Sequence, residues 1–291
     1  MIVWILCNED AGRGLSADDL RKLVERAGHT VAGVAKQYDE GSPLPDGNPD
    51  LVVAAGGDGT VATVAGIASK MSATLAILPL GTANNIATSL CLNAPVPELI
   101  ASWSTARRVP FDLGCARAAS KEWLVVEGVG CGLVPAGIAR AQAWNKHLED
   151  IPPAAEVAAA VRAFRDTLVD LEPRPWTLVL DGQAMSDVFL LVEVLNIRSI
   201  GPNLVFGPDA SPSDGYFDVI LAQECHREEL LTYLGHRAEG RDTLLALPRH
   251  RAREVVINGC RELHIDDERV DTRELGPISI RIEPAAIHVL A

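Results

Sequence analysis

The first hundred residues alternate short apolar runs with amphipathic helical patterns, and this alternation constrains the fold more than any other feature. Four apolar runs indicate buried strands at residues 2–7, 30–34, 51–55 and 75–80. Helical patterns begin near Ser16 and Val61, and a shorter one follows the fourth strand. Strands that alternate with helices in this way build parallel βα units. The pattern therefore predicts a three-layer α/β domain over residues 1–110.

The rest of the chain, residues 111–291, has a different pattern of expected helices and strands. Two helical stretches are expected at about 134–148 and 154–171, and a third lies near 228–237. Strand patterns dominate elsewhere, and Asp181-Gly182 is a hairpin-turn signal between them. The expected strands are 123–126, 176–180, 187–195, 217–222, 254–257, 263–265 and 278–282. We predict an antiparallel, β-sandwich-like C-terminal domain with helices on one side, whose last strand can return to the first domain.

Charge and composition exclude several classes of protein. The 291 residues carry a formal charge of −13, and so acidic a surface repels nucleic acid. No apolar stretch reaches the ~18 residues of a membrane helix. The six cysteines include no Cys-x-x-Cys pair, which argues against a zinc ribbon or a disulfide scaffold. These features predict a soluble, cytoplasmic protein.

A glycine-rich turn, Gly56-Gly57-Asp58-Gly59-Thr60, joins the third expected strand to the helix after it. Glycines let successive N–H groups converge on an anion at a helix N-terminus. An acid beside a phosphate implies either a bridging Mg²⁺ or a hydrogen bond to a nearby hydroxyl. The alternative is a tight turn with Asp58 as a helix cap. The number of glycines exceeds what a cap requires, so an anion-binding function is favoured over the cap.

A second glycine-containing turn, Pro79-Leu80-Gly81-Thr82-Ala83-Asn84-Asn85, follows the fourth strand. A hydroxyl from Thr82 and amides from Asn84 and Asn85 suit a ribose or phosphate neighbourhood without adding charge. An asparagine that caps the next helix is a nearly equal alternative.

The chain lacks one standard nucleotide-binding pattern and approaches a second. The Walker pattern Gly-x-x-x-x-Gly-Lys-Ser/Thr is absent from the sequence. A dinucleotide fingerprint nearly occurs twice, starting at Gly12 and at Gly57. The acid expected ~20 residues later would be Asp39, in a loop, for the first, and falls in an apolar run for the second. Dinucleotide binding is therefore a weak alternative.

With its two glycine-rich turns in this order, the chain resembles the diacylglycerol kinase catalytic family, which includes sphingosine, ceramide and bacterial lipid kinases. Later motifs follow in the family's order. They are Phe111-Asp112-Leu113-Gly114, Asn196, Gly201, Pro208-Asp209-Ala210, Asp214-Gly215-Tyr216-Phe217-Asp218 and Asp266-Asp267-Glu268.

The resemblance implies an ATP- and Mg²⁺-dependent transfer of phosphate to the hydroxyl of a diacylglycerol-like or other amphipathic alcohol. Residues 1–110 would be a nucleotide-binding domain, in which the first turn cradles the nucleotide phosphates and Thr82 lies near them. Asp58 in this turn would be a catalytic residue as well as a phosphate-site residue. Glu268 would be the general base, with Asp266 close by. Asp214, with backbone oxygens of Ser211 and Tyr216, resembles a structural Mg²⁺ site of the bacterial members.

Some positions depart from the family's pattern. Asn85 stands where the family usually has an aspartate, and Asp267 replaces a turn glycine. An NAD kinase and a nucleotide-binding regulator without transfer activity therefore stay open as alternatives. A lipid acceptor implies at most transient contact with a membrane surface, and a homodimer is left open. Basic spots at Arg107-Arg108 and His236–Arg241 are more typical of solvated faces.

Overall fold

The computed structural model describes residues 1–9, 15–38, 46–145 and 152–291. The chain forms two compact units. The first consists of Met1–Asp112 and Pro284–Ala291, and the second is Leu113–Glu283. Two strands, β5 (Arg108–Ala118) and β18 (Ile278–Leu290), continue along the chain from one unit into the other.

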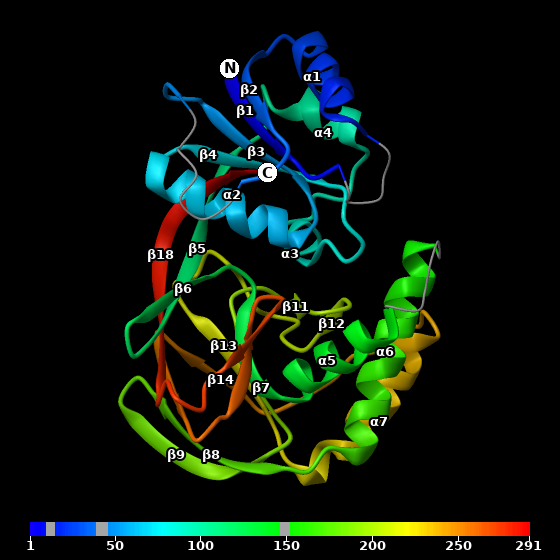
Figure 1. The fold of residues 1–291 in the computed structure, drawn as a ribbon, viewed down its shortest axis with the longest axis vertical. Helices are drawn as coiled ribbons and strands as arrows, with labels where there is room; N and C mark the ends of the chain where they lie inside the picture. The colour runs from blue at the N-terminus through cyan, green and yellow to red at the C-terminus, as the bar shows by residue number, and fades with distance from the viewer. Residues whose placement is uncertain (10–14, 39–45, 146–151) are drawn as a thin grey trace. The chain divides into compact units, whose positions relative to one another are not determined.

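The first unit is a parallel sheet with helices, as predicted (Figure 1). Its elements are β1 (Ile2–Cys7), α1 (Ala17–Arg26), β2 (Thr30–Ala35), β3 (Leu51–Gly56), α2 (Asp58–Met71), β4 (Thr74–Pro79), α3 (Asn85–Ser89) and α4 (Val96–Ser102). Strands β3 and β4 are buried along their whole length, which explains their continuous apolar sequences. The helix start predicted at Ser16 is confirmed, because its hydroxyl accepts the N–H of Asp19.

Strand order in this unit is β2-β1-β3-β4, followed by the C-terminal end of β18. The chain moves in one direction from β1 to β2 and in the opposite direction from β3 to β4. Right-handed crossovers then put α1 and α2 on opposite faces, which makes three layers. The order reverses between β1 and β3, and ligands of open α/β sheets bind at the carboxyl ends of strands at such a reversal. The first glycine turn follows β3 at this place.

Among its described residues, the second unit contains two large antiparallel sheets and a third sheet of two strands. Its elements are β6 (Lys121–Val125), β7 (Gly128–Gly132), α5 (Leu133–Asn145), α6 (Pro153–Asp170), β8 (Arg174–Leu180), β9 (Gln183–Phe189), β10 (Leu191–Leu195), β11 (Ser199–Ile200), β12 (Leu204–Val205), β13 (Phe217–Ala222), a 3₁₀ turn (Glu224–His226), α7 (Arg227–Ala238), β14 (Arg249–Ala252), β15 (Glu254–Asn258), β16 (Glu262–Ile265) and β17 (Glu268–Asp271). One sheet runs β14-β13-β10-β7-β16-β17. The other contains β15, β8 and β9 beside the first part of β18.

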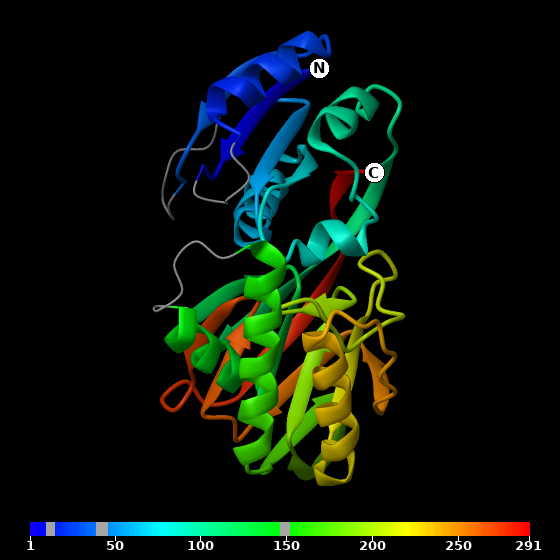
Figure 2. The same ribbon diagram turned by 90° about the vertical axis from the view of Figure 1, so that its right-hand side faces the viewer.

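Side chains that alternate along the strands build two separate cores, so the predicted sandwich with helices on one side is confirmed. Val192 and Val194 of β10 face the core between the sheets, with Trp176 and Val255 of the other sheet. Leu191 and Leu195 face the helices instead. Two of these helices, α6 and α7, lie side by side (green and gold in Figure 2).

One predicted strand, residues 187–195, is wrong as a single element. It consists of the end of β9 and the whole of β10, which belong to different sheets. The chain crosses at Leu190, whose N–H donates to Ala222 and whose carbonyl accepts from Leu133. The hairpin turn at Asp181-Gly182 is confirmed, and both residues have the positive φ of a type I′ turn.

No helix among the described residues has the length and apolar character that crossing a membrane requires. The near-fingerprint residues Gly12 and Gly14, and the loop acid Asp39, lie outside the described residues.

Candidate functional site

The first glycine turn leaves the start of α2 open to a ligand. Gly57 is the N-cap residue, and within the described part of the chain it makes no side-chain cap hydrogen bond. The start of such a helix favours an anion through its N–H groups and its dipole. Gly56 is required because a Cβ there would lie 2.3 Å from the Thr60 hydroxyl oxygen, which packs against its backbone.

The second turn lies directly against the first. The N–H of Leu80 donates to the carbonyl of Gly56 at 2.9 Å. A Cβ on Gly81 would come within 2.4 Å of the Gly57 Cα, so the two backbones touch at these glycines. Asn84 holds the second turn in shape, since its side chain accepts from the N–H of Gly81 and donates to its carbonyl. The structure thus brings together the two turns that the sequence places more than twenty residues apart.

Asp58 links the two turns through the start of α3. Its Oδ2 accepts the N–H of Asn85 at 2.9 Å, and its Oδ1 accepts the N–H of Ile86 at 3.0 Å. The alternative of a helix-capping aspartate is therefore correct in kind, but the helix that it caps is α3 and not α2. Since both carboxylate oxygens accept backbone N–H groups, the geometry makes Asp58 a residue that positions the second turn.

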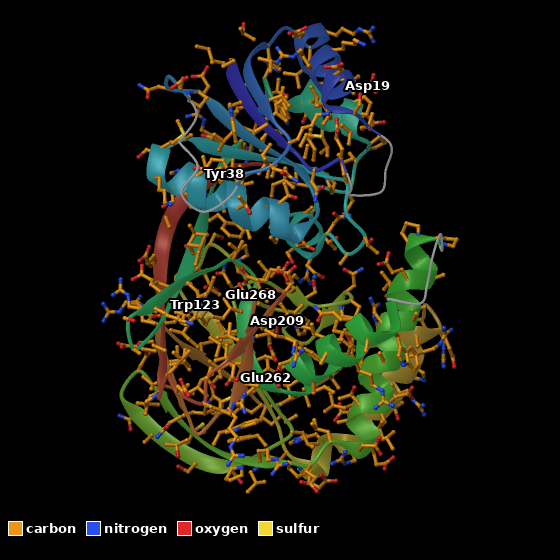
Figure 3. The ribbon with its side chains drawn as sticks, viewed as in Figure 1. Asp19, Tyr38, Trp123, Asp209, Glu262 and Glu268 are labelled. Atoms are coloured by element: carbon orange, nitrogen blue, oxygen red, sulfur yellow. The ribbon has the colours of Figure 1, made fainter. Side chains whose placement is uncertain are left out.

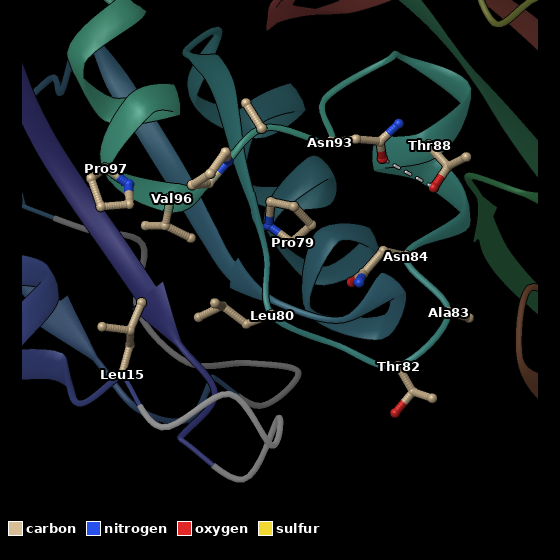
Figure 4. Close-up of a pocket in the computed structure, with 12 residues that line it drawn as sticks. Leu15, Pro79, Leu80, Thr82, Ala83, Asn84, Thr88, Asn93, Val96 and Pro97 are labelled. Carbon is tan, nitrogen blue, oxygen red and sulfur yellow. Dashed lines mark hydrogen bonds between the residues drawn. The ribbon is translucent and has the colours of Figure 1, made fainter. Parts of the chain in front are cut away.

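A pocket of about 540 Å³ opens beside the second turn within the first unit (Figure 4). Apolar side chains from three segments, Leu15, Leu80 and Val96, form part of its wall. Thr82 and Asn84 supply polar groups to the lining, and Thr88 contacts Asn93 farther along it. Its volume and its mixture of apolar walls with a few polar groups are typical of sites for small molecules.

Replacing Gly81 by alanine should separate the two turns. The added methyl group cannot fit at 2.4 Å from the Gly57 Cα, and the obstacle is backbone, which does not move aside cheaply. We expect the free energy of unfolding to fall by about 1–3 kcal/mol in urea titrations, together with weaker ADP binding.

The matched control is Gly235→Ala in α7, where the new Cβ meets only the Arg165 Nε at 3.8 Å. It should leave stability unchanged or raise it by about 0.5–1 kcal/mol, because alanine favours a helix. Equal effects of the two substitutions would contradict a close contact between the turns.

In the second unit, the motif Asp266-Asp267-Glu268 forms the tip of the β16–β17 hairpin. Asp266 has a φ of 52° and is partly buried. Its carboxylate accepts the N–H groups of Val126, Glu127 and Gly128 at 2.7–3.2 Å, while its own N–H donates to the Gly128 carbonyl. The buried amide of Asn196 donates to the Val126 carbonyl, so the same segment is held from a second side. This region of the unit is consequently tightly ordered by hydrogen bonds.

Glu268 begins β17, next to this tip, and is labelled in Figure 3. Its side chain is exposed and makes no hydrogen bond or ion pair with the residues that the structure describes. A carboxylate with these properties can meet a substrate hydroxyl, as a general base must.

The pKa of Asp266 predicts how the stability of the protein depends on pH. Burial raises the pKa of this carboxyl to about 6, although the three backbone N–H donors act to lower it. Because this exceeds the unfolded value of about 3.9, the folded state binds the proton more tightly. The resulting stabilisation, up to about 2 kcal/mol, is present below pH 4 and is lost as the pH rises through 6.

Urea unfolding of the wild type and of Asp266→Asn at pH 4.5 and pH 7 measures this effect. The amide does not titrate and keeps an acceptor oxygen for the backbone groups, so the difference between the two proteins should favour the wild type more at pH 4.5. A difference that favours it more at pH 7 would mean that the N–H donors dominate and lower the pKa.

The predicted Mg²⁺ residues Ser211, Asp214 and Tyr216 lie on one turn before β13. Asp214 Oδ1 accepts the N–H of Tyr216, and Oδ2 accepts from the Arg251 guanidinium at 2.5 Å. Arg251 and Arg253 also lie over the Tyr216 ring. In this arrangement the turn does not fit a bound cation, because the Arg251 guanidinium already donates a hydrogen bond to the Asp214 carboxylate. A magnesium role for these residues stays a prediction that requires displacement of Arg251.

Sequence reasoning missed two buried polar residues of this unit. Glu193 interrupts the apolar run of β10, and His264 lies in β16; both are completely buried, and they form a hydrogen bond. The signal for Glu193 was present, since a charged residue in the middle of an apolar strand requires a partner.

Comparisons with known proteins agree with this arrangement. The model of the diacylglycerol kinase catalytic domain matches residues 3–116, and that of the YegS C-terminal NAD kinase beta sandwich-like domain matches residues 132–291. A diacylglycerol kinase of Mycobacterium tuberculosis is 26% identical over 257 residues, which cover 83% of this chain and 76% of the relative. A YegS-like lipid kinase of Cronobacter sakazakii is 33% identical over 132 residues, 40% of this chain and 43% of that protein.

The fold also agrees with a solved structure. The crystal structure of a diacylglycerol kinase from Bacillus anthracis has a TM-score of 0.73 at 20% identity, and the match covers 99% of this chain and 96% of that one. The architecture of both units is thus shared with that protein.

Proposed function

Because this chain belongs to the diacylglycerol kinase catalytic family, we propose that it transfers the γ-phosphoryl group of ATP to the hydroxyl of a diacylglycerol-like or other amphipathic alcohol. The observation that best supports the proposal is the joining of the two glycine turns. Asp58 and the Gly57–Gly81 contact hold them together beside the start of α2, where the N-cap residue Gly57 has no side chain. An anion site built in this way from backbone groups suits a polyphosphate.

ATP would bind with its phosphates at the first-turn N–H groups of α2, such as those of Gly59 and Thr60. The pocket lined by Leu15, Leu80 and Val96 has the volume for the nucleoside, and Thr82 on its lining would be near the ribose or phosphates. Magnesium that arrives with ATP would neutralise part of the phosphate charge. The role of Asp58 in this proposal is to keep the second turn in place.

The transfer step needs one base. Glu268 would accept the proton of the acceptor hydroxyl while the hydroxyl oxygen bonds to the γ-phosphorus. The bond between the γ-phosphorus and the bridging oxygen then breaks, and that oxygen leaves with ADP. The products are ADP and a phosphate monoester, and the proton leaves Glu268 for water. Phosphoryl transfer depends mainly on positioning and charge neutralisation, so an anion cradle and one base suffice.

Incubation with ATP labelled at the γ-phosphate and a mixed lipid extract, followed by lipid separation, tests the proposal. We expect label in a lipid fraction, and none when the extract is omitted. In a parallel incubation with NAD in place of the extract, formation of labelled NADP would favour the NAD kinase alternative. ADP binding with no transfer to any acceptor would favour a nucleotide-binding regulator, and absence of both binding and transfer would end the kinase proposal.

A further inference from the structure

Glu193 and His264 form a buried polar pair next to the β16–β17 hairpin. Both side chains have an exposed fraction of 0%, and His264 Nε2 lies 2.8 Å from Glu193 Oε2. The other ring nitrogen, Nδ1, lies 2.8 Å from the carbonyl oxygen of Asp266. The pair thus connects the centre of β10 to the backbone at the hairpin tip.

Gly130 makes the pair possible. Gly130 pairs with Glu193 of β10 on one side and with His264 of β16 on the other. The two side chains can therefore meet only by passing over Gly130. A Cβ at Gly130 would lie 2.1 Å from Glu193 Oε1 and 2.3 Å from its carboxyl carbon. The absence of a side chain on the middle strand is therefore what lets the acid and the imidazole meet across it.

The hydrogen bonds determine how many protons Glu193 and His264 hold between them. A carbonyl cannot donate, so Nδ1 carries a proton and donates it to Asp266. Nε2 and the carboxylate then share one proton, whichever of them holds it. Burial raises the pKa of Glu193, since the ionised form loses its hydration. Loss of either partner would leave the other buried without this bond, which is unfavourable.

The group that the pair holds is the turn next to the proposed base. Asp266 has a left-handed backbone, its carboxylate takes three N–H groups from residues 126–128, and its carbonyl takes the imidazole N–H. These hydrogen bonds, made by the side chain and by the main-chain carbonyl, fix the orientation of Asp266. Glu268 follows only two residues later at the start of β17.

We propose that Glu193 and His264 are positioning residues, which fix the Asp266 carbonyl across Gly130 and thereby hold the turn that presents Glu268. The catalytic part of this inference rests on the proposed function, because it assumes that Glu268 is the base. The structural part does not, since it concerns only the order of the turn.

Three kinds of variant of the whole protein test the proposal. Glu193→Met and His264→Leu each break the pair with side chains of similar volume. Glu193→Gln is the conservative rescue, because its amide can donate to Nε2 of a neutral imidazole that still donates from Nδ1. Tyr233→Phe is the control, since it removes a buried hydrogen bond to the Val205 N–H in the other core of the same unit.

The readouts are hydrogen exchange of the amides of residues 126–128 and 266, and steady-state phosphotransfer. Breaking the pair should speed exchange of these amides at least about 10-fold and lower kcat by about 10²-fold, with KM for ATP little changed. Glu193→Gln should restore both within a few-fold, and Tyr233→Phe should change neither.

Unchanged exchange in a folded Glu193→Met or His264→Leu protein would overturn the structural part whether or not the protein is a kinase. Faster exchange with unchanged kcat would overturn the positioning role. A Glu193→Gln protein as impaired as Glu193→Met would also overturn it, because the geometry alone would then not suffice. A wild-type protein that transfers no phosphate would remove the proposed function and the catalytic part together, while the exchange result would still decide the structural part.

Discussion

Replacing Glu268 by glutamine should lower the rate of phosphate transfer by about 10²–10⁴-fold, the usual contribution of a general base. The amide cannot accept the proton of the acceptor hydroxyl, so the loss should appear in kcat. ADP affinity and the melting temperature should stay unchanged, because the side chain is exposed and makes no hydrogen bond or ion pair with the described residues. Initial rates at saturating ATP, with ADP binding measured separately, give the comparison.

Asp267→Asn is the matched control for this experiment. It removes the same charge one residue away, from a side chain that is also exposed. We expect its turnover to stay within a few-fold of the wild type. If Glu268→Gln retains its activity, or if both variants lose it equally, the base lies elsewhere.

Replacing Asp58 by alanine should abolish nucleotide binding without unfolding the protein. The change removes the acceptor of two backbone N–H groups, those of Asn85 and Ile86, and frees the start of α3 from the first turn. Loss of such a cap costs about 0.5–2 kcal/mol, too little to unfold most domains. ADP affinity should fall by about 10²-fold or more, since Asn85 and Ile86 at the end of the second turn would no longer be fixed to the first turn.

Asp58→Asn distinguishes a role of Asp58 in accepting the two backbone N–H groups from a role in holding Mg²⁺. An amide retains one acceptor oxygen, so one of the two N–H bonds can persist and binding should be intermediate between the wild type and Asp58→Ala. If Asp58 acted by holding Mg²⁺, the amide would bind as poorly as alanine. A normal melting curve with unchanged ADP affinity in Asp58→Ala would show that the cap is not needed for binding.

The local structure of this chain was predictable because it depends on neighbours in the sequence. Continuous apolar runs identified β1 and β3, and the Ser16 hydroxyl marked the start of α1. The hairpin at Asp181-Gly182 follows from residues that tolerate positive φ. The break at Leu190 was not predictable in this way, since both halves of residues 187–195 favour a strand and only pairing with different sheets divides them.

The candidate site was predictable in its residues but not in their roles. Glycines and an acid at residues 56–60 predicted an anion-binding turn from the sequence. That Asp58 caps α3 could not be read from it, because its partners Asn85 and Ile86 are nearly thirty residues away. Glu268 was identified through the family resemblance, and its base role stays a prediction.

By itself, the sequence determined the order of strands and helices, the two-domain α/β and sandwich architecture, and the two turns at which chemistry is expected. Periodicity, glycine content and capping residues act over a few positions, and they are written in the chain directly. Only the tertiary structure decided that Gly57 touches Gly81, that Glu193 meets His264 across Gly130, and that Arg251 occupies Asp214. These contacts depend on strand register and on packing between residues far apart in the chain. Within a strand, a register shift of one position would send each side chain to the opposite face of the sheet.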